Sequence, residues 1–268
     1  MDDATFTQLK RRLAKLLDLD LDGYKQPQMR RRIETFVSKH GNDPAAFIER
    51  LPREPDLLQA TRDMLTINVT EFFRDRAQWD RLETAVLPAL VKHAGALKIW
   101  SAGCSHGQEP LSLAMLLDEA GALRRSTILA TDFDHAALAR AQAGGPYSAD
   151  EVRGISAPRM QAYFEQREGK YWADQRLLRH ATYRQLNLLK DRFDANFDLI
   201  VCRNVMIYFE ADVKEALIHR FRDALRPGGV LFIGATEALL GADAEGLDRL
   251  GGNFYGRPTD ARPGRVAA

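Results

Sequence analysis

The sequence is poor in cysteine and shows no metal-binding pattern. Its 268 residues include only two cysteines, Cys104 and Cys202, which lie far apart in the chain. A disulfide framework is therefore not expected, and the composition fits a reducing compartment. The six histidines form no HExxH motif or Cys/His cluster, so we expect no metal site.

Long apolar runs and a strong excess of one charge are also missing. No run approaches the length of a transmembrane helix, and residues 1–5 are acidic and polar, unlike a signal peptide. The net charge of +1 gives no general reason to expect nucleic acid or an anionic membrane as partner. The lack of a membrane span and of a signal peptide predicts a cytoplasmic protein. A content of 45% hydrophobic residues is enough for a globular core.

Residues 1–65 are predicted to form an all-α domain, because apolar residues around Leu9, Ile33 and Phe47 recur at helical spacing. The domain carries two basic clusters. Such runs are most often solvated helix faces, and an electrostatic docking surface for an acidic partner is the alternative. The clusters are Lys10, Arg11, Arg12 and Lys15, and Lys25, Arg30, Arg31 and Arg32.

Residues 66–95 are predicted to form a connector. Its first part places Phe72 and Phe73 beside polar groups that can hydrogen-bond a ligand, and a helix follows as far as Pro88. Thr70 could also cap that helix.

Strands and helices alternate in residues 96–258. Strands are expected at 97–102, 127–132, 197–202 and 229–234, and helices at 110–120, 134–142 and 211–225. This alternation predicts an α/β domain whose parallel sheet has helices on both faces. Residues 145–185 break the rhythm with Gly-Pro punctuation, so we expect a small inserted β-subdomain there. Residues 259–268 are expected to be a loosely attached tail.

The first strand of this domain ends in a loop of small residues. Gly103 and Gly107 allow unusual backbone dihedrals, and Pro110 suits the first turn of the next helix. A strand, a small-residue loop and a helix form the layout that holds nucleotide-like cofactors. By itself the pattern also fits a plain turn without a ligand.

Polar residues follow several of the predicted strands. Ligands bind beyond the carboxyl ends of strands in such sheets, and an acid after the second strand typically accepts hydrogen bonds from ribose hydroxyls. Asp132 holds that position. Its alternative role is to cap the next helix, for which Asp134 could serve instead. Asn187 can both donate to and accept from an adenine edge, and Arg203 and Asn204 end a buried strand.

Two further features favour S-adenosylmethionine over a nicotinamide cofactor. The Pro227-Gly228-Gly229 turn matches the turn before strand five of S-adenosylmethionine-dependent methyltransferases, and the first loop lacks GxGxxG. At this level of detail the chain resembles the CheR family of chemoreceptor glutamate O-methyltransferases. The most specific segments are Asn-x-Thr-x-Phe-Phe-Arg from Asn68 and Cys-Arg-Asn-Val-x-Ile-Tyr-Phe from Cys202.

The resemblance implies a Rossmann-like class I methyltransferase domain behind an all-α receptor-docking domain, and methyl transfer from S-adenosylmethionine to receptor glutamates. A glutamate is already ionised at pH 7, so no general base is needed. Arg74 and Tyr208 are the candidates for holding the carboxylate. Their alternatives are an ion pair of Arg74 with Asp75 or Glu71, and core packing of Tyr208. The implied cofactor contacts are Asn68, Thr70, Arg74, Glu109, Asp132, Asn187, Leu188, Arg203 and Asn204.

The resemblance also implies a partner. The basic helix with Arg30, Arg31 and Arg32 would dock the cytoplasmic helical domain of a methyl-accepting chemoreceptor, and the protein is expected to act as a monomer. The alternatives are a non-catalytic CheR-like module that binds receptors or senses the cofactor, and a methyltransferase for another substrate.

Two places depart from the family pattern. The family's Ser-Thr-Gly-Glu-Glu-Pro loop reads Ser-His-Gly-Gln-Glu-Pro here, with His106 and Gln108 as the changes. Some members of the family use the inserted subdomain to bind a tether peptide at the receptor C-terminus. Here the insertion is short around residues 166–171. We therefore expect the protein to recognise its receptor without such a peptide.

Overall fold

The computed structural model describes residues 1–66, 68–239 and 241–259. It divides the chain into two compact units. The first, here called the helical unit, contains Met1–Asn68 and Tyr208–Val213. The second, the sheet unit, contains Val69–Ile207 and the chain from Lys214 onward. The division falls three residues beyond the predicted end of the all-α domain and gives the helical unit a short segment from far along the chain.

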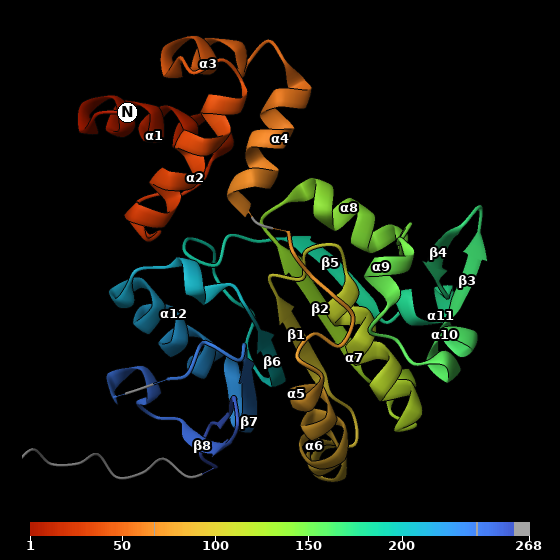
Figure 1. The fold of residues 1–268 in the computed structure, drawn as a ribbon. Helices are drawn as coiled ribbons and strands as arrows, with labels where there is room; N and C mark the ends of the chain where they lie inside the picture. Colours follow the sequence, from red (N-terminus) through yellow and green to blue (C-terminus); the bar gives the residue numbers. More distant parts are fainter. Residues whose placement is uncertain (67, 240, 260–268) are drawn as a thin grey trace, which may run out of the picture. The chain divides into compact units, whose positions relative to one another are not determined.

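Four helices build the helical unit: α1 (Asp3–Leu17), α2 (Gln26–Lys39), α3 (Pro44–Arg50) and α4 (Pro55–Thr66) (Figure 1). Asp2 caps α1 by accepting a hydrogen bond from Thr5 N, and Asp43 caps α3. Pro27 stands in the first turn of α2, where a missing N–H costs nothing. The apolar stripes converge on a core that includes Leu13, Ile33 and Leu51.

A seven-stranded sheet forms the centre of the sheet unit, in the order β5-β2-β1-β6-β7-β9-β8. The first five strands in this order run parallel, and β9 and β8 add an antiparallel edge. Strand β6 is buried along its whole length, as expected for a central parallel strand. The strands are β1 (Lys98–Ala102), β2 (Thr127–Asp132), β5 (Ala181–Gln185), β6 (Phe197–Cys202), β7 (Leu225–Ile233), β8 (Asp248–Gly251) and β9 (Phe254–Gly256).

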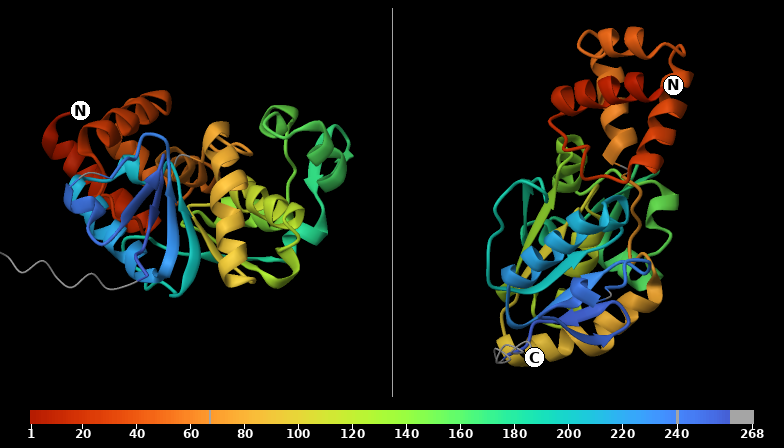
Figure 2. Two further views of the ribbon diagram at one scale, coloured as in Figure 1. Left: turned by 90° about the horizontal axis from the view of Figure 1, so that it is seen from below. Right: turned by 90° about the vertical axis from the view of Figure 1, so that its left-hand side faces the viewer.

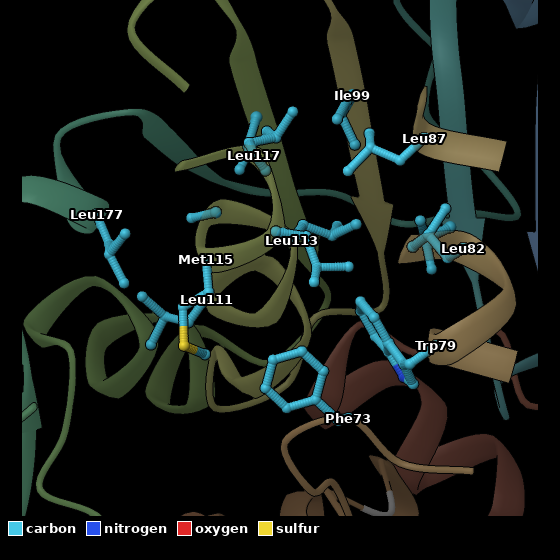
Figure 3. Packing of buried hydrophobic residues seen from close by; sticks show 14 of the residues in the cluster. Phe73, Trp79, Leu82, Leu87, Ile99, Leu111, Leu113, Met115, Leu117 and Leu177 are labelled. Carbon is cyan, nitrogen blue, oxygen red and sulfur yellow. The ribbon is translucent and has the colours of Figure 1, made fainter. Parts of the chain in front are cut away.

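Helices cover both faces of this sheet (Figure 2). One face packs on α7 (Gln108–Glu119) and on the connector, which runs through α5 (Arg76–Arg81), a π-helical turn (Leu82–Val86) and α6 (Leu87–Ala94). Figure 3 shows this core, with Trp79 and Leu82 of the connector near Ile99 and Leu113. On the other face, Phe221 of α12 (Ala211–Ala224) meets Trp100 edge-on.

The inserted region is more helical than the sequence suggests. It holds α9 (Ala149–Val152), α10 (Ala157–Tyr163), a hairpin of β3 (Phe164–Arg167) and β4 (Lys170–Ala173), and α11 (Gln175–Leu178). Its predicted last residues form β5, which pairs with β2 in the main sheet. The mostly polar sequence Ala-Thr-Tyr-Arg-Gln gives an edge strand little apolar signal, which is why β5 was not separated from the insertion.

The remaining short elements are α8 (His135–Ala143) and the 3-10 turns Leu123–Arg125, Met206–Tyr208 and Gly241–Ala244. Across the described part of the chain, every helix is too short or too polar to cross a bilayer. Residues 260–268 of the predicted tail lie outside the described residues.

Candidate functional site

The loop after β1 has a backbone shape that β2 holds in place. Three of its residues lie in the left-handed region, with φ of 87° at Gly103, 49° at Ser105 and 92° at Gly107. The amides of Gly103 and Cys104 donate to Thr131 O at 2.8 and 2.9 Å. The sequence was right that this loop needs unusual dihedrals.

Close packing is a second reason why glycine is needed at positions 103 and 107. A Cβ on Gly103 would lie 2.5 Å from Val205 Cγ2, and one on Gly107 would lie 2.9 Å from Ala141 Cβ. Both distances are too short for a real side chain. The glycines therefore let the loop approach the segment after β6 and helix α8 closely, whether or not a ligand is bound.

Asp132 is the last residue of β2, and its carboxylate holds the loop after β1 in place. Its carboxylate accepts from Ser105 N at 2.7 Å and from Asp134 N at 2.9 Å. The helix-capping role belongs to Asp134, which accepts from Ala136 N and Ala137 N at the start of α8. Asp132 is thus released from capping, and a carboxylate with four lone-pair positions can still accept from a ligand. Burial raises the pKa of Asp132 to about 6.

Glu109 lies in the first turn of α7 and is buried. Ser101 Oγ of β1 donates to its Oε1 at 2.7 Å. Burial raises the pKa of Glu109 to about 7, although the nearby Arg203 charge acts in the opposite direction. The side chain is therefore a carboxylate whose ionised form would gain from a cationic ligand.

Arg203 follows β6 and holds the connector. Its guanidinium donates to Arg74 O at 2.7 Å and to Asp75 Oδ2 at 2.8 Å, and it lies 4.9 Å from the Phe232 ring centroid. Only 3% of the side chain is exposed. Burial lowers its pKa. Among the described residues, nothing accepts a hydrogen bond from its buried Nε, so this donor is available to a ligand.

Arg74 belongs to a strained part of the connector. Its neighbours Phe73 and Asp75 have φ of 53° and 61°, values that few non-glycine residues adopt. Arg74 Nη1 donates to Val69 O at 2.9 Å. The ion pair considered for Arg74 with Asp75 is not what forms, because Asp75 pairs with Arg203. Thr70 is partly buried in the same segment, and Asp75 rather than Thr70 stands at the N-cap of α5.

Glu237 holds the backbone beside the predicted site residues Arg203 and Asn204, and it was not predicted from the sequence. It is 3% exposed and accepts from the backbone amides of Asn204, Ile207 and Gly234 at 2.8, 3.1 and 2.8 Å. These bonds connect the segment after β6 to the end of β7. A polar residue three positions after Gly234, where the buried strand ends, was the available signal.

Asn187 and Leu188 follow β5, at the same edge of the sheet as Asp132. Strand β5 pairs with β2 so that Gln185 faces Asp132, which places Asn187 two residues further on. Asn187 Oδ1 accepts from Leu189 N at 2.9 Å, and Leu188 is buried. The hydrogen bond from Leu189 N therefore sets the orientation of the Asn187 side-chain amide.

The other predicted site residues belong to the helical unit. Asn68 Nδ2 donates to Thr66 Oγ1 at 3.3 Å, and Tyr208 belongs to the late segment of that unit. Of the predicted docking arginines, Arg30 pairs with Asp3 and Glu34, Arg32 donates to Met64 O, and Arg31 is exposed. Part of the predicted positive charge is thus already neutralised within the unit.

The two departures in the loop are accommodated in different ways. The carbonyl of His106 accepts from Tyr147 Oη at 2.8 Å, so this residue keeps its backbone role. Gln108 is fully buried, and its Nε2 lies 3.4 Å from Glu151 Oε1. A glutamate at position 108 would place a second carboxylate beside Glu151, which an amide avoids.

Comparison with known proteins covers nearly the whole chain. Residues 4–66 match the family model "CheR methyltransferase, all-alpha domain", and residues 68–249 match "CheR methyltransferase, SAM binding domain". A chemotaxis protein methyltransferase of Listeria monocytogenes is 40% identical over 89% of this chain and 92% of its own. Chemotaxis protein methyltransferase 1 of Pseudomonas aeruginosa is 36% identical over 88% and 91%. The solved structure of PKMT2 from Rickettsia typhi in complex with AdoHcy is 17% identical over 51% of this chain and 20% of that one, with a TM-score of 0.34, too weak to add to the argument.

Proposed function

Because the chain belongs to the CheR methyltransferase family, we propose that it transfers the methyl group of S-adenosylmethionine to glutamate side chains of chemoreceptors. The family, the all-α domain followed by a class I methyltransferase domain, and the cofactor were all predicted correctly from the sequence. The alternative of a non-catalytic module finds no support among the relatives, which carry the names of methyltransferases.

One observation supports the cofactor site most strongly: the carboxyl edge of the sheet gathers groups suited to S-adenosylmethionine. Asp132 keeps acceptor positions for ribose hydroxyls, Glu109 is a buried carboxyl beside a loop of small residues, and the Nε of Arg203 is an unused buried donor. We infer that these residues bind the cofactor together with Thr70, Arg74, Asn187, Leu188, Asn204 and, from the helical unit, Asn68. When bound, the cofactor supplies an electrophilic methyl group on its sulfonium.

We propose that Arg74 and Tyr208 hold the substrate carboxylate for this transfer. A glutamate has a pKa near 4.3 and needs no base at neutral pH. Catalysis then depends on aligning the carboxylate and excluding water. Arg74 suits orientation more than tight pairing, because an arginine that bound the ground state strongly would not accelerate the transfer. Two hydrogen bonds fix the connector around Arg74. Its guanidinium donates to Val69 O, and its carbonyl accepts from the guanidinium of Arg203.

We further propose that the substrate is the cytoplasmic helical domain of a receptor and that the enzyme works on it as a monomer. Receptor helices near methylation sites are rich in glutamate, which a basic face attracts. Of the three predicted docking residues, the exposed Arg31 is the best placed for this contact, because Arg30 and Arg32 already have partners.

The test uses S-adenosylmethionine labelled on its methyl group, the full-length protein and receptor-rich membranes. The expected result is label on the receptor that alkali releases as methanol, since esters of glutamate are base-labile. Cofactor binding without any base-labile label would support the non-catalytic module. Label on a small molecule or another protein would contradict the receptor as substrate.

A further inference from the structure

We propose that residues 23–26 of the helical unit, here called the α2 entry turn, position Tyr208 for catalysis. This inference rests on the proposed function, because it assigns the α2 entry turn a role in the same methyl transfer. Gln26 is then the central positioning residue of this turn.

The α2 entry turn pairs with the backbone around Tyr208. Tyr24 and Phe209 form an isolated antiparallel β-bridge. Lys25 N donates to Tyr208 O at 2.9 Å, and Glu210 N donates to Gly23 O at 3.0 Å. These two bonds flank Phe209 and hold the backbone of Tyr208 to the turn. The strongest candidate for a catalytic tyrosine is therefore anchored by residues more than 180 positions earlier in the chain.

Side chains reinforce this pairing. Tyr24 and Phe209 meet edge-on, with ring centroids 5.1 Å apart and planes at 84°, a favourable geometry for aromatic rings. Phe209 is only 5% exposed. Tyr208 itself lines a pocket of the helical unit together with Leu21, Tyr24 and Met29. Residues of the same unit therefore surround Tyr208 at this pocket.

Gln26 organises the α2 entry turn. Its Nε2 donates to Tyr24 O at 2.6 Å and to Leu21 O at 3.1 Å, and its Oε1 accepts from Lys10 Nζ at 3.0 Å. Its backbone N also donates to Glu210 Oε1 at 3.3 Å. One amide side chain therefore fixes the turn internally, while its own backbone contacts the Tyr208–Val213 segment.

Loosening the α2 entry turn should lower turnover, because the rate of methyl transfer depends strongly on the position of groups that orient the substrate. A displacement of about 1 Å of a group that orients the substrate can lower the rate about 100-fold. Loss of the Gln26 amide would loosen the turn that holds Tyr208 while leaving the residues of the sheet unit intact. Turnover should then fall without a matching loss of cofactor affinity.

The experiment compares full-length Gln26→Ala with wild type and with Gln59→Ala. This matched control removes the side-chain amide of a half-buried glutamine of α4, which donates to Asp63. We expect Gln26→Ala to lower kcat at least tenfold, with the Kd of S-adenosylhomocysteine unchanged within about twofold. Hydrogen exchange should become faster at residues 208–210. Gln59→Ala should match wild type in all three measurements.

A second pair of variants keeps the proposal testable if Gln26→Ala fails to fold. Tyr24→Ala removes the edge contact with Phe209, and Tyr24→Phe keeps the ring; turnover should fall in the first and recover in the second. Unchanged kcat despite faster exchange at 208–210, or an equal loss of cofactor affinity, would overturn the positioning role. Absence of receptor methylation by the wild type would instead refute the proposed function, so the two failures are distinguishable.

Discussion

At the scale of single residues, the proposed cofactor site contains two carboxyl groups, those of the buried Glu109 and the half-buried Asp132. Glu109 and Asp132 both have raised pKa values, about 7 and about 6, because burial disfavours their charged forms. S-adenosylmethionine carries a sulfonium and an ammonium group, so a contact of Glu109 with either cationic group would favour the ionised carboxyl. On the proposed function, cofactor binding is therefore coupled to the loss of a proton from Glu109.

This coupling predicts a pH dependence of cofactor binding. Below pH 7 the free protein holds a proton on Glu109 that binding must displace, so affinity should fall as pH decreases. We expect the Kd of S-adenosylmethionine to rise about tenfold between pH 8 and pH 6, measured by calorimetry. Glu109→Gln should bind more weakly at pH 8 and show a flatter profile. A wild-type Kd that is constant over this range would contradict the role of Glu109.

Glu237 permits a prediction about stability. Replacing it by alanine leaves three amides, those of Asn204, Ile207 and Gly234, without their acceptor. We expect Glu237→Ala to lower the free energy of unfolding by about 3 kcal/mol in urea denaturation, and to weaken cofactor binding through Asn204. The exposed Glu245 offers the matched control, since Glu245→Ala should change stability by less than about 0.5 kcal/mol. Equal effects of the two substitutions would show that the three bonds contribute little.

Residue types and spacing could predict part of this site and not the rest. Asp132 was predicted because an acid after the second strand has a known chemical use, and Asp134 was correctly considered as the cap. Glu237 was missed because its three partners lie on two separated segments, which a single sequence does not bring together. The preference of Asp75 for Arg203 over its neighbour Arg74 is likewise a tertiary fact.

At the scale of elements, the loop after β1 depends on close approach to its neighbours. Gly103 combines a φ of 87° with a Cβ position 2.5 Å from Val205 Cγ2. We expect Gly103→Ala to destabilise the fold by about 2 kcal/mol and to lower cofactor affinity, as measured by thermal unfolding and calorimetry.

Two comparisons separate the causes of that loss. Gly121→Ala has a similar backbone conformation, φ of 63°, with nothing within 4 Å, so it measures the backbone cost alone. Adding Val205→Ala to Gly103→Ala should recover part of the stability by removing the clash. If Gly103→Ala were no worse than Gly121→Ala, close packing against Val205 would not be the reason for the glycine.

Element prediction succeeded where periodicity was strong. Strands β1, β2 and β6 and helices α7, α8 and α12 lie within two residues of the predicted ranges. Strand β5 and the helices of the insertion were not resolved, because four- or five-residue polar segments carry no clear period. The π-helical turn of Leu82–Val86 has no recognisable sequence signal either.

At the scale of the whole molecule, the chain divides into two units whose boundaries the sequence did not predict. The all-α domain was expected to end at residue 65, but the helical unit also includes Tyr208–Val213. Pairing between segments so distant in sequence leaves no local pattern.

The short insertion permits a prediction about receptor recognition. Its hairpin joins β3 and β4 through only Glu168 and Gly169, both with positive φ, in keeping with a tight two-residue turn. We expect no binding of a receptor C-terminal peptide to the protein in calorimetry, and equal methylation of receptors with and without that tail. Clear binding of the peptide would refute recognition without a tether.

We propose above that the carboxyl edge of the sheet binds the cofactor beside the residues that hold the substrate. A crystal structure of the full chain with S-adenosylhomocysteine tests this most directly. We expect ribose hydroxyls bonded to Asp132, the cofactor against the loop that begins at Gly103, and Arg74 and Tyr208 facing the sulfur. A cofactor bound away from Asp132, or a sulfur that neither Arg74 nor Tyr208 approaches, would contradict it.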